Sequence, residues 1–259
     1  EMAKLGLGIG RNGPFRFITE RDTYLWNGNN LDAQFLRLLR ELRYDPAKAR
    51  LPAHTGVVSV PTPNGDNPWL HVCDRWPTDP VGKTPRRVIV LAPVHNQDAV
   101  GYMGDDSPWA RFADAHGLVL VVPQFYMSDL IFRADHRFTH VRYAQVWSGD
   151  ALLRALDRID RTVPIEKGRL LVHGVASGSG FACHLAAWRP DLVTAVSVNN
   201  GNWGMPRFRE PGLQPMSAQA GIRYFVTAST GDTVHRSYDC SVDFVTRLRG
   251  AGVSAEWRA

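Results

Sequence analysis

From Thr55 onward, two patterns of apolar residues alternate along the chain. Short continuous apolar runs, such as VIVLAP (88–93) and LVLVVPQF (118–125), are typical of strands buried on both faces of a sheet. Between such runs lie segments of about 10 to 15 residues in which apolar positions recur at helical spacing. This alternation predicts an α/β fold, with a mostly parallel central sheet and helices on both faces.

The first two predicted strands differ from the rest because a short turn joins them. Asn64-Gly65 lies in this turn, and such a pair favours an antiparallel hairpin at the start of the sheet. The predicted strands are 55–61, 68–76, 86–93, 118–125, 169–174, 193–201, 222–229 and 254–259. The predicted helices are 106–117, a helix around 152–159, 180–190 and 237–252, the last with Tyr238, Val242, Val245 and Leu248 on one face.

The chain before this pattern is different in character. Residues 1–28 are irregular and rich in Gly and Asn, and an amphipathic helix is expected from Asn30 until Pro46 ends it. We therefore divide the 259 residues into an N-terminal extension (1–54) and a domain (55–259), and expect the two to form one structural unit.

Composition excludes several classes of function. The net charge of +5 is spread along the chain rather than gathered in a stripe, which argues against a nucleic-acid-binding protein. No apolar run approaches the roughly 20 residues needed to span a membrane. The chain begins without a signal segment, so it is expected to be cytoplasmic, or secreted with its signal peptide removed. The pattern leaves the oligomeric state open.

Cysteine and histidine spacings indicate no metal or cofactor. Cys73, Cys183 and Cys240 lie far apart and allow at most one disulfide, and Cys183 is expected to be a small buried apolar residue. The histidines show neither HxxxH nor HExxH spacing, so no metal site is predicted.

The segment HGVASGSG joins a predicted strand to a predicted helix. Its glycine spacing fits G-x-S-x-G, a sharp turn in which the positions two before and two after the centre carry almost no side chain. A centre at Ser177 puts Val175 in one of these positions, and a centre at Ser179 puts Phe181 there. Only a centre at Ala176 has glycine on both sides, so alanine stands where a nucleophile is expected.

This segment resembles the nucleophile elbow of the α/β-hydrolase superfamily, especially its esterases and polyester depolymerase-like members. FVTASTGDTV is similar to that family's stretch after the seventh strand, and the resemblance assigns Asp232 as the acid of the catalytic triad. VIVLAPVHNQD is similar to the segment that supplies an oxyanion-hole N–H, although Ala92-Pro93 replaces the usual His-Gly. The resemblance implies one donor at Val94 or His95 and a second at the N–H of Ser177.

The histidine of the triad follows the last strand in that family. Here the only histidine after Asp232 is His235, three residues further on at the start of a predicted helix, where it is poorly placed as the base. We expect the histidine beyond Ala259.

Loops at the carboxyl ends of parallel strands are where a substrate pocket forms. Apolar residues in these loops indicate a hydrophobic ester substrate, either a small molecule or a polymer. The expected pocket residues are Trp203, Phe125, Tyr126, Tyr102 and Met103.

The resemblance implies a carboxylic ester hydrolase that works through a Ser-His-Asp triad and an acyl-enzyme, here in an inactive form with alanine at the nucleophile position. Two alternatives stay open. One is a natural pseudohydrolase that acts as a binding protein. The other is a different chemistry on the same fold, such as a lyase, peptidase or thioesterase reaction.

Overall fold

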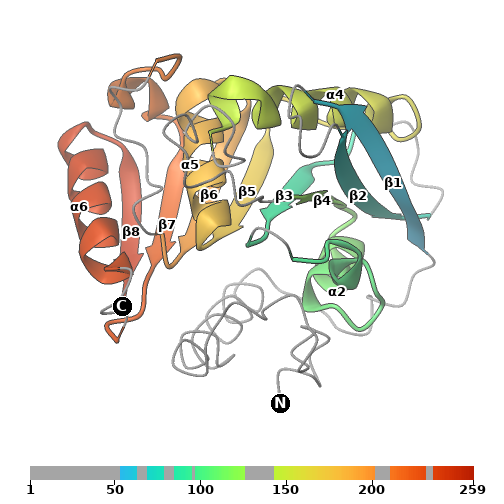
Figure 1. The fold of residues 1–259 in the computed structure, drawn as a ribbon, viewed down its shortest axis with the longest axis horizontal. Coiled ribbons are helices and arrows are strands. Elements are labelled where there is room, and N and C mark those ends of the chain that lie inside the picture. The colour runs from blue at the N-terminus through green and yellow to red at the C-terminus, as the bar shows by residue number, and fades with distance from the viewer. Residues whose placement is uncertain are drawn as a thin grey trace.

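The computed structural model describes residues 53–62, 69–78, 85–94, 97–125, 143–201, 211–231 and 236–259. Eight strands form one sheet in the order β1-β2-β4-β3-β5-β6-β7-β8 (Figure 1). β2 is antiparallel to both of its neighbours, and every other pair beyond it is parallel, as the sequence predicts. The strands are β1 (Ala53–Pro61), β2 (Trp69–Pro77), β3 (Val88–Ala92), β4 (Val119–Gln124), β5 (Leu170–Val175), β6 (Val193–Asn199), β7 (Arg223–Thr227) and β8 (Ser254–Arg258).

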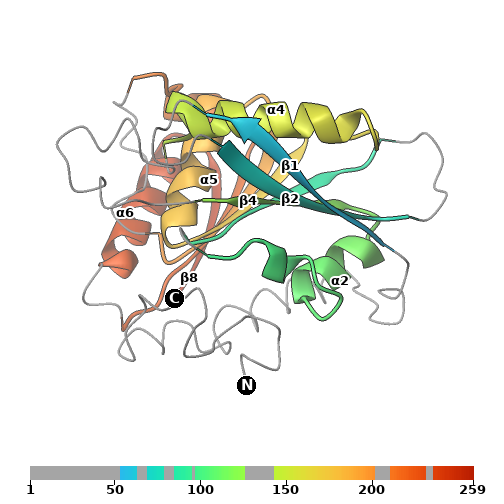
Figure 2. The ribbon, with the colours of Figure 1, turned by 45° about the vertical axis from the view of Figure 1, so that its right-hand side comes forward.

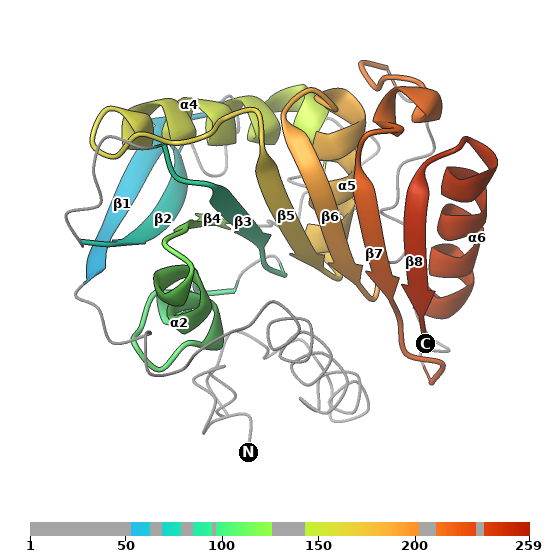
Figure 3. The same cartoon turned by 180° about the vertical axis from the view of Figure 1, so that it is seen from behind.

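Helices cover both faces of the sheet. α4 lies on one side of β1 and β2, and α2 lies on the other side of the sheet (Figure 2). α5 packs on β5 and β6 while α6 packs on β7 and β8, and the view from behind shows both helices beyond these strands (Figure 3). The α-helices are α2 (Pro108–Ala115), α4 (Gly149–Asp160), α5 (Ser177–Trp188) and α6 (Ser237–Gly250).

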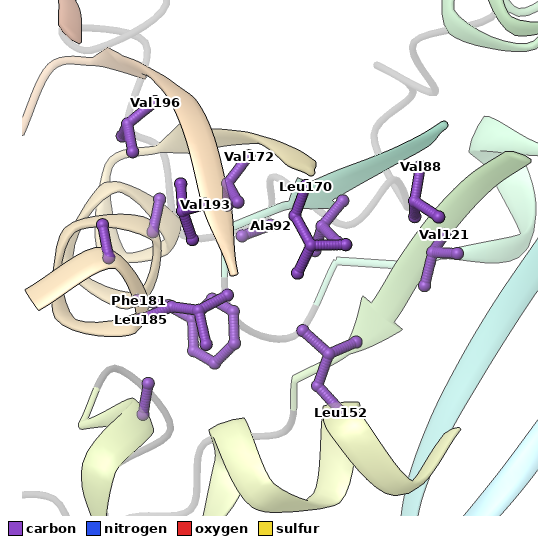
Figure 4. Packing of buried hydrophobic residues seen from close by; sticks show 14 of the residues in the cluster. Val88, Ala92, Val121, Leu152, Leu170, Val172, Phe181, Leu185, Val193 and Val196 are labelled. Atoms are coloured by element: carbon purple, nitrogen blue, oxygen red, sulfur yellow. The ribbon is translucent and has the colours of Figure 1, made fainter. Parts of the chain in front are cut away.

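The two faces of the sheet bury separate apolar clusters. Alternate residues of β3, β4, β5 and β6 face α4 and α5, where Val121, Leu152 and Phe181 lie in the larger cluster (Figure 4). The intervening residues of β3 and β4, including Leu120, face α2. Because the central strands are buried on both sides, their sequences are continuously apolar rather than alternating.

Local signals in the sequence fix the ends of α2. Ser107 caps the helix, with its hydroxyl accepting a hydrogen bond from the Ala110 N–H at 3.4 Å, and Pro108 is the first helical residue. Gly117 follows the helix with a φ of +64°, a conformation that favours glycine. Both ends agree with the prediction.

Three short segments were not predicted. A π-helical turn, η6 (Ala144–Ser148), leads into α4, and 3₁₀ turns form at η4 (Val100–Tyr102) and η7 (Met216–Gln219). Gly149 is needed where η6 joins α4, since a Cβ there would lie 2.6 Å from the Ala144 carbonyl oxygen.

The predicted apolar face of α6 is partly wrong. Val242 is exposed, whereas Ser241 and Phe244 are fully buried together with Val245 and Leu248. The helix is rotated so that Phe244 fills the core beside Tyr224, and the Ser241 hydroxyl donates to the Gly201 carbonyl oxygen at 3.2 Å.

Residues 1–52 lie outside the described part, so the predicted N-terminal extension stays a prediction, as does the domain boundary at 54. Cys183 is fully buried as expected, and the three cysteines are not joined in disulfides. Within the described ranges, no helix has the length and apolar character that a membrane crossing requires.

Candidate active site

Ala176 lies at the sharp turn between β5 and α5. Its dihedral angles are φ 49° and ψ −112°, a conformation that costs a non-glycine residue of order 1–3 kcal/mol. The Ala176 N–H donates to the Asn199 carbonyl oxygen at 3.0 Å, which ties the turn to the end of β6. Surrounding structure therefore holds this residue in a strained conformation at the end of a buried parallel strand.

The two glycines that flank Ala176 cannot carry side chains. A Cβ on Gly174 would lie 2.3 Å from the Gly178 carbonyl oxygen, and a Cβ on Gly178 would lie 2.0 Å from the Ala92 carbonyl oxygen. Atoms that are not bonded do not approach so closely, so glycine is required at both positions. This is the geometric requirement from which Ala176 was identified as the centre of the turn.

The two neighbouring serines occupy other roles. Ser179 is fully buried, and its Oγ lies 2.9 Å from the Gly174 carbonyl oxygen and 2.8 Å from that of Asn199. Ser177 is half-buried and is the first residue of α5, so its N–H belongs to the positive end of that helix. An N–H in this position is suited to stabilising an anion.

The end of β3 lies against the turn. The Gly178 Cα faces the carbonyl oxygens of Ala92 and Pro93, which would be 2.0 and 2.6 Å from a Cβ placed on it. Val94, the next residue, is half-buried, and its carbonyl oxygen accepts a hydrogen bond from the Gln97 N–H at 3.2 Å. The structure thus brings Val94, Ala176 and Ser177 to the same edge of the sheet, where β5 to β8 also end (Figure 3).

His173 lies in β5, three residues before Ala176, and is 5% exposed. Its Nδ1 is 3.0 Å from the Ser197 Oγ, and its ring lies 4.7 Å from that of Trp109 in α2. Burial lowers the pKa of His173 from 6.5 to about 3, so the imidazole is neutral at ordinary pH. This histidine therefore packs between Ser197 of β6 and Trp109 of α2.

Two asparagines at the end of β6 connect the turn to the end of β7. Besides its contacts with Ala176 and Ser179, Asn199 donates from Nδ2 to the Thr227 Oγ at 2.7 Å. Asn200 has a φ of +48°, and its Oδ1 accepts from the Ser229 N–H at 2.8 Å. Sequence reasoning missed both residues, although an Asn-Asn-Gly run at a strand end favours such a conformation.

The predicted pocket residues fall into three groups. Tyr102 is half-buried in η4. Met103 and Phe125 are 5% and 1% exposed and belong to the apolar clusters. The Phe125 ring lies 4.8 Å from the Phe181 ring. We therefore assign Met103 and Phe125 to the core. The remaining predicted site residues lie outside the described part of the chain: His95, Tyr126, Trp203, Asp232 and His235.

No family model and no curated protein match the sequence. Solved structures do match. A thermostable esterase has 16% identity and a TM-score of 0.56, covering 78% of this chain and 54% of its own. An esterase from Rhizomucor miehei has 10% identity and a TM-score of 0.55, covering 86% of this chain and 80% of its own. S-formylglutathione hydrolase from Staphylococcus aureus has 14% identity and a TM-score of 0.54, covering 80% of this chain and 90% of its own.

The fold is the α/β-hydrolase fold. Within an α/β-hydrolase fold, the junction of β5 and α5 is the expected place of the nucleophile, and Ala176 occupies that junction. Among the described residues, no three His, Cys, Asp or Glu side chains are grouped so as to bind a metal. In the described part of the chain, the site comprises a strained turn, a helix N-terminus and an adjacent loop.

Proposed function

We propose that this chain has the architecture of a carboxylic ester hydrolase in which alanine replaces the nucleophilic serine at position 176. In this proposal a serine at 176 attacks the ester carbonyl, and the N–H groups of Ser177 and Val94 or His95 stabilise the oxyanion. Asp232 orients a histidine that lies beyond Ala259, after β8. The substrate is a hydrophobic ester, and the chain with Ala176 binds it without cleaving it.

The observation that carries the proposal is the backbone of Ala176. Its φ of 49° and ψ of −112° are costly, and glycine is needed at Gly174 and Gly178 to allow them. An ordinary connection between a strand and a helix has no need of this strain. Strain of this kind is typical of sites where one side chain must be presented at a fixed place. The similarity to solved esterases agrees with this interpretation.

The decisive variant is Ala176→Ser. We expect it to release p-nitrophenol from short aryl esters and to react covalently with an aryl fluorophosphonate, which peptide mass spectrometry locates on residue 176. The assay uses the chain continued to the stop codon of its gene and, in parallel, residues 1–259, which lack the proposed histidine and should turn over far more slowly. Asp232→Asn in the Ala176→Ser background is expected to lower turnover by roughly 10⁴-fold.

The unaltered chain is the matched control, because it already carries Ser177 and Ser179 next to the site. It should show neither turnover nor labelling. Ala176→Asp and Ala176→Cys test the other nucleophiles that this fold uses. If none of the three variants produces turnover in the longer chain, the hydrolase proposal is wrong.

A second candidate is a pseudohydrolase that binds an ester or a related ligand. The observation in its favour is alanine itself at position 176. The two candidates differ in the encoding gene. A serine codon at 176 excludes the pseudohydrolase, and an alanine codon without a histidine codon downstream of residue 259 supports it.

A further inference from the structure

The loop that joins β3 to α2 is held by a side chain from a third element. Gln124 is the last residue of β4, is 8% exposed, and lies in a strand that is otherwise apolar. Its Nε2 donates to the Gln97 carbonyl oxygen, and its Oε1 accepts from the Ala99 N–H at 2.5 Å. One side-chain amide thus binds a carbonyl and an N–H two residues apart in this loop, as a neighbouring strand would.

These contacts lead directly to the position expected for the oxyanion donor. Gln97, which Gln124 holds, donates its N–H to the Val94 carbonyl oxygen at 3.2 Å. Val94 also directly follows Ala92 and Pro93, whose carbonyl oxygens face Gly178. The position of Val94 relative to Ala176 is therefore set at two places, by the contact with Gly178 and by Gln124.

The far end of the loop has a separate anchor. Arg75 in β2 donates to the Met103 carbonyl oxygen at 2.5 Å and pairs with the buried Asp114 at 2.6 Å. Nine residues separate Met103 from Val94, whereas Gln97 is three residues away. Of the two buried polar side chains, Gln124 is the one whose partner in the loop, Gln97, lies close enough to Val94 to control the oxyanion donor.

We propose that Gln124 is a positioning residue that sets the place of the oxyanion-binding N–H on the loop after β3. The inference rests on the proposed function, because it concerns the same site. It implies that Gln124 governs the preference of the site for an anionic, tetrahedral ligand over a neutral ligand of the same size. A residue that served stability alone would affect the binding of both ligands equally.

The test uses the chain as it stands, with Ala176, so it needs no turnover. Calorimetry measures the Kd of p-nitrophenyl methylphosphonate, a stable tetrahedral anion, and of 4-nitroacetanilide, a neutral ligand with the same aryl group. The unaltered chain is expected to prefer the phosphonate. Gln124→Met keeps the size of the side chain but removes both hydrogen bonds, and we expect it to reduce that preference roughly tenfold or more while the anilide affinity stays within about twofold.

Gln219→Met is the matched control. Gln219 is likewise buried and hydrogen-bonded, to the Tyr224 hydroxyl, but it precedes the amino end of β7, away from the carboxyl ends of the strands where Ala176 lies. Its variant should retain the preference. If Gln124→Met does not fold, Ala99→Pro replaces the N–H that Gln124 binds by a ring carbon, at a φ of −70° that proline adopts; the ring displaces the Gln124 amide and should reduce the preference in the same direction.

The outcomes separate the two proposals. If the unaltered chain shows no preference for the phosphonate, no oxyanion site exists, and the proposed function and this inference are both refuted. If the preference is present and survives in Gln124→Met or Ala99→Pro, only the positioning role of Gln124 is refuted. A loss of preference confined to the Gln124 and Ala99 variants supports it.

Discussion

His173 should make the stability of this protein sensitive to mild acid. The folded chain holds this imidazole neutral down to a pKa of about 3, whereas the unfolded chain protonates it near 6.5. Between these values the unfolded state binds more protons, so the free energy of unfolding falls as the pH is lowered through this window. Above pH 6.5 the imidazole is neutral in both states, and His173 no longer lowers the free energy of unfolding.

The size of the effect follows from the two pKa values. The whole difference corresponds to about 5 kcal/mol at 1.36 kcal/mol per pH unit. Lowering the pH from 8 to 5 crosses about 1.5 of these 3.5 pH units, and it should cost about 2 kcal/mol through His173 alone. That is a large part of the stability of an ordinary domain.

Urea unfolding at a series of pH values measures this effect in the unaltered chain and in His173→Gln, which carries no titrating group at that position. The stability of His173→Gln should fall less steeply, with the two curves converging by about 2 kcal/mol between pH 8 and 5. Val172→Ala is the control, since Val172 is buried in the same strand and its truncation costs the same at every pH. Parallel curves for His173→Gln and the unaltered chain would refute the reasoning.

Three further predictions concern the turn and the thiols. Ala176→Gly should raise the free energy of unfolding by about 1 kcal/mol, because it relieves the strain at φ 49°. The control, Ala182→Gly inside α5, should lower that free energy. Urea unfolding at pH 7.5 measures both changes. Gly178→Ala should cost at least about 3 kcal/mol in the same assay, because its methyl group would meet the Ala92 carbonyl oxygen, and an unchanged midpoint would contradict the geometry of the turn. Cys240, half-buried, should react with a thiol reagent before unfolding, while the two buried cysteines react only in urea; equal rates for all three would contradict the described core.

The sequence was sufficient for the sheet because each central strand is buried on both faces. Runs such as 119–124 leave no polar face, and the boundaries of α2 follow from Ser107 and Gly117, whose chemistry acts locally. The glycine spacing around Ala176 could also be interpreted from the sequence, since the contact that requires glycine at Gly174 is with Gly178 in the same turn, although Gly178 itself meets the distant Ala92.

Contacts between distant segments could not be predicted from the sequence in the same way. The π-helical turn before α4 depends on the packing of Gly149 against the Trp188 ring, which is far along the chain. Phe125 was expected in a pocket because it follows a strand, but it packs against Phe181 in the core. Gln124 lies in a predicted apolar strand, and its role could not be predicted from the sequence, because its partners lie in a loop that the fold brings alongside.

The conformation at Ala176 is imposed by its neighbours and does not depend on a side chain at that position. This independence has a consequence for the mutations that can occur at codon 176. Alanine and serine codons of the form GCN and UCN differ in their first base, so one mutation exchanges a methyl group for a hydroxymethyl group on a backbone already folded to present it. Under the proposed function, a single base change at codon 176 would therefore remove or restore the nucleophile without a change in the fold of the turn.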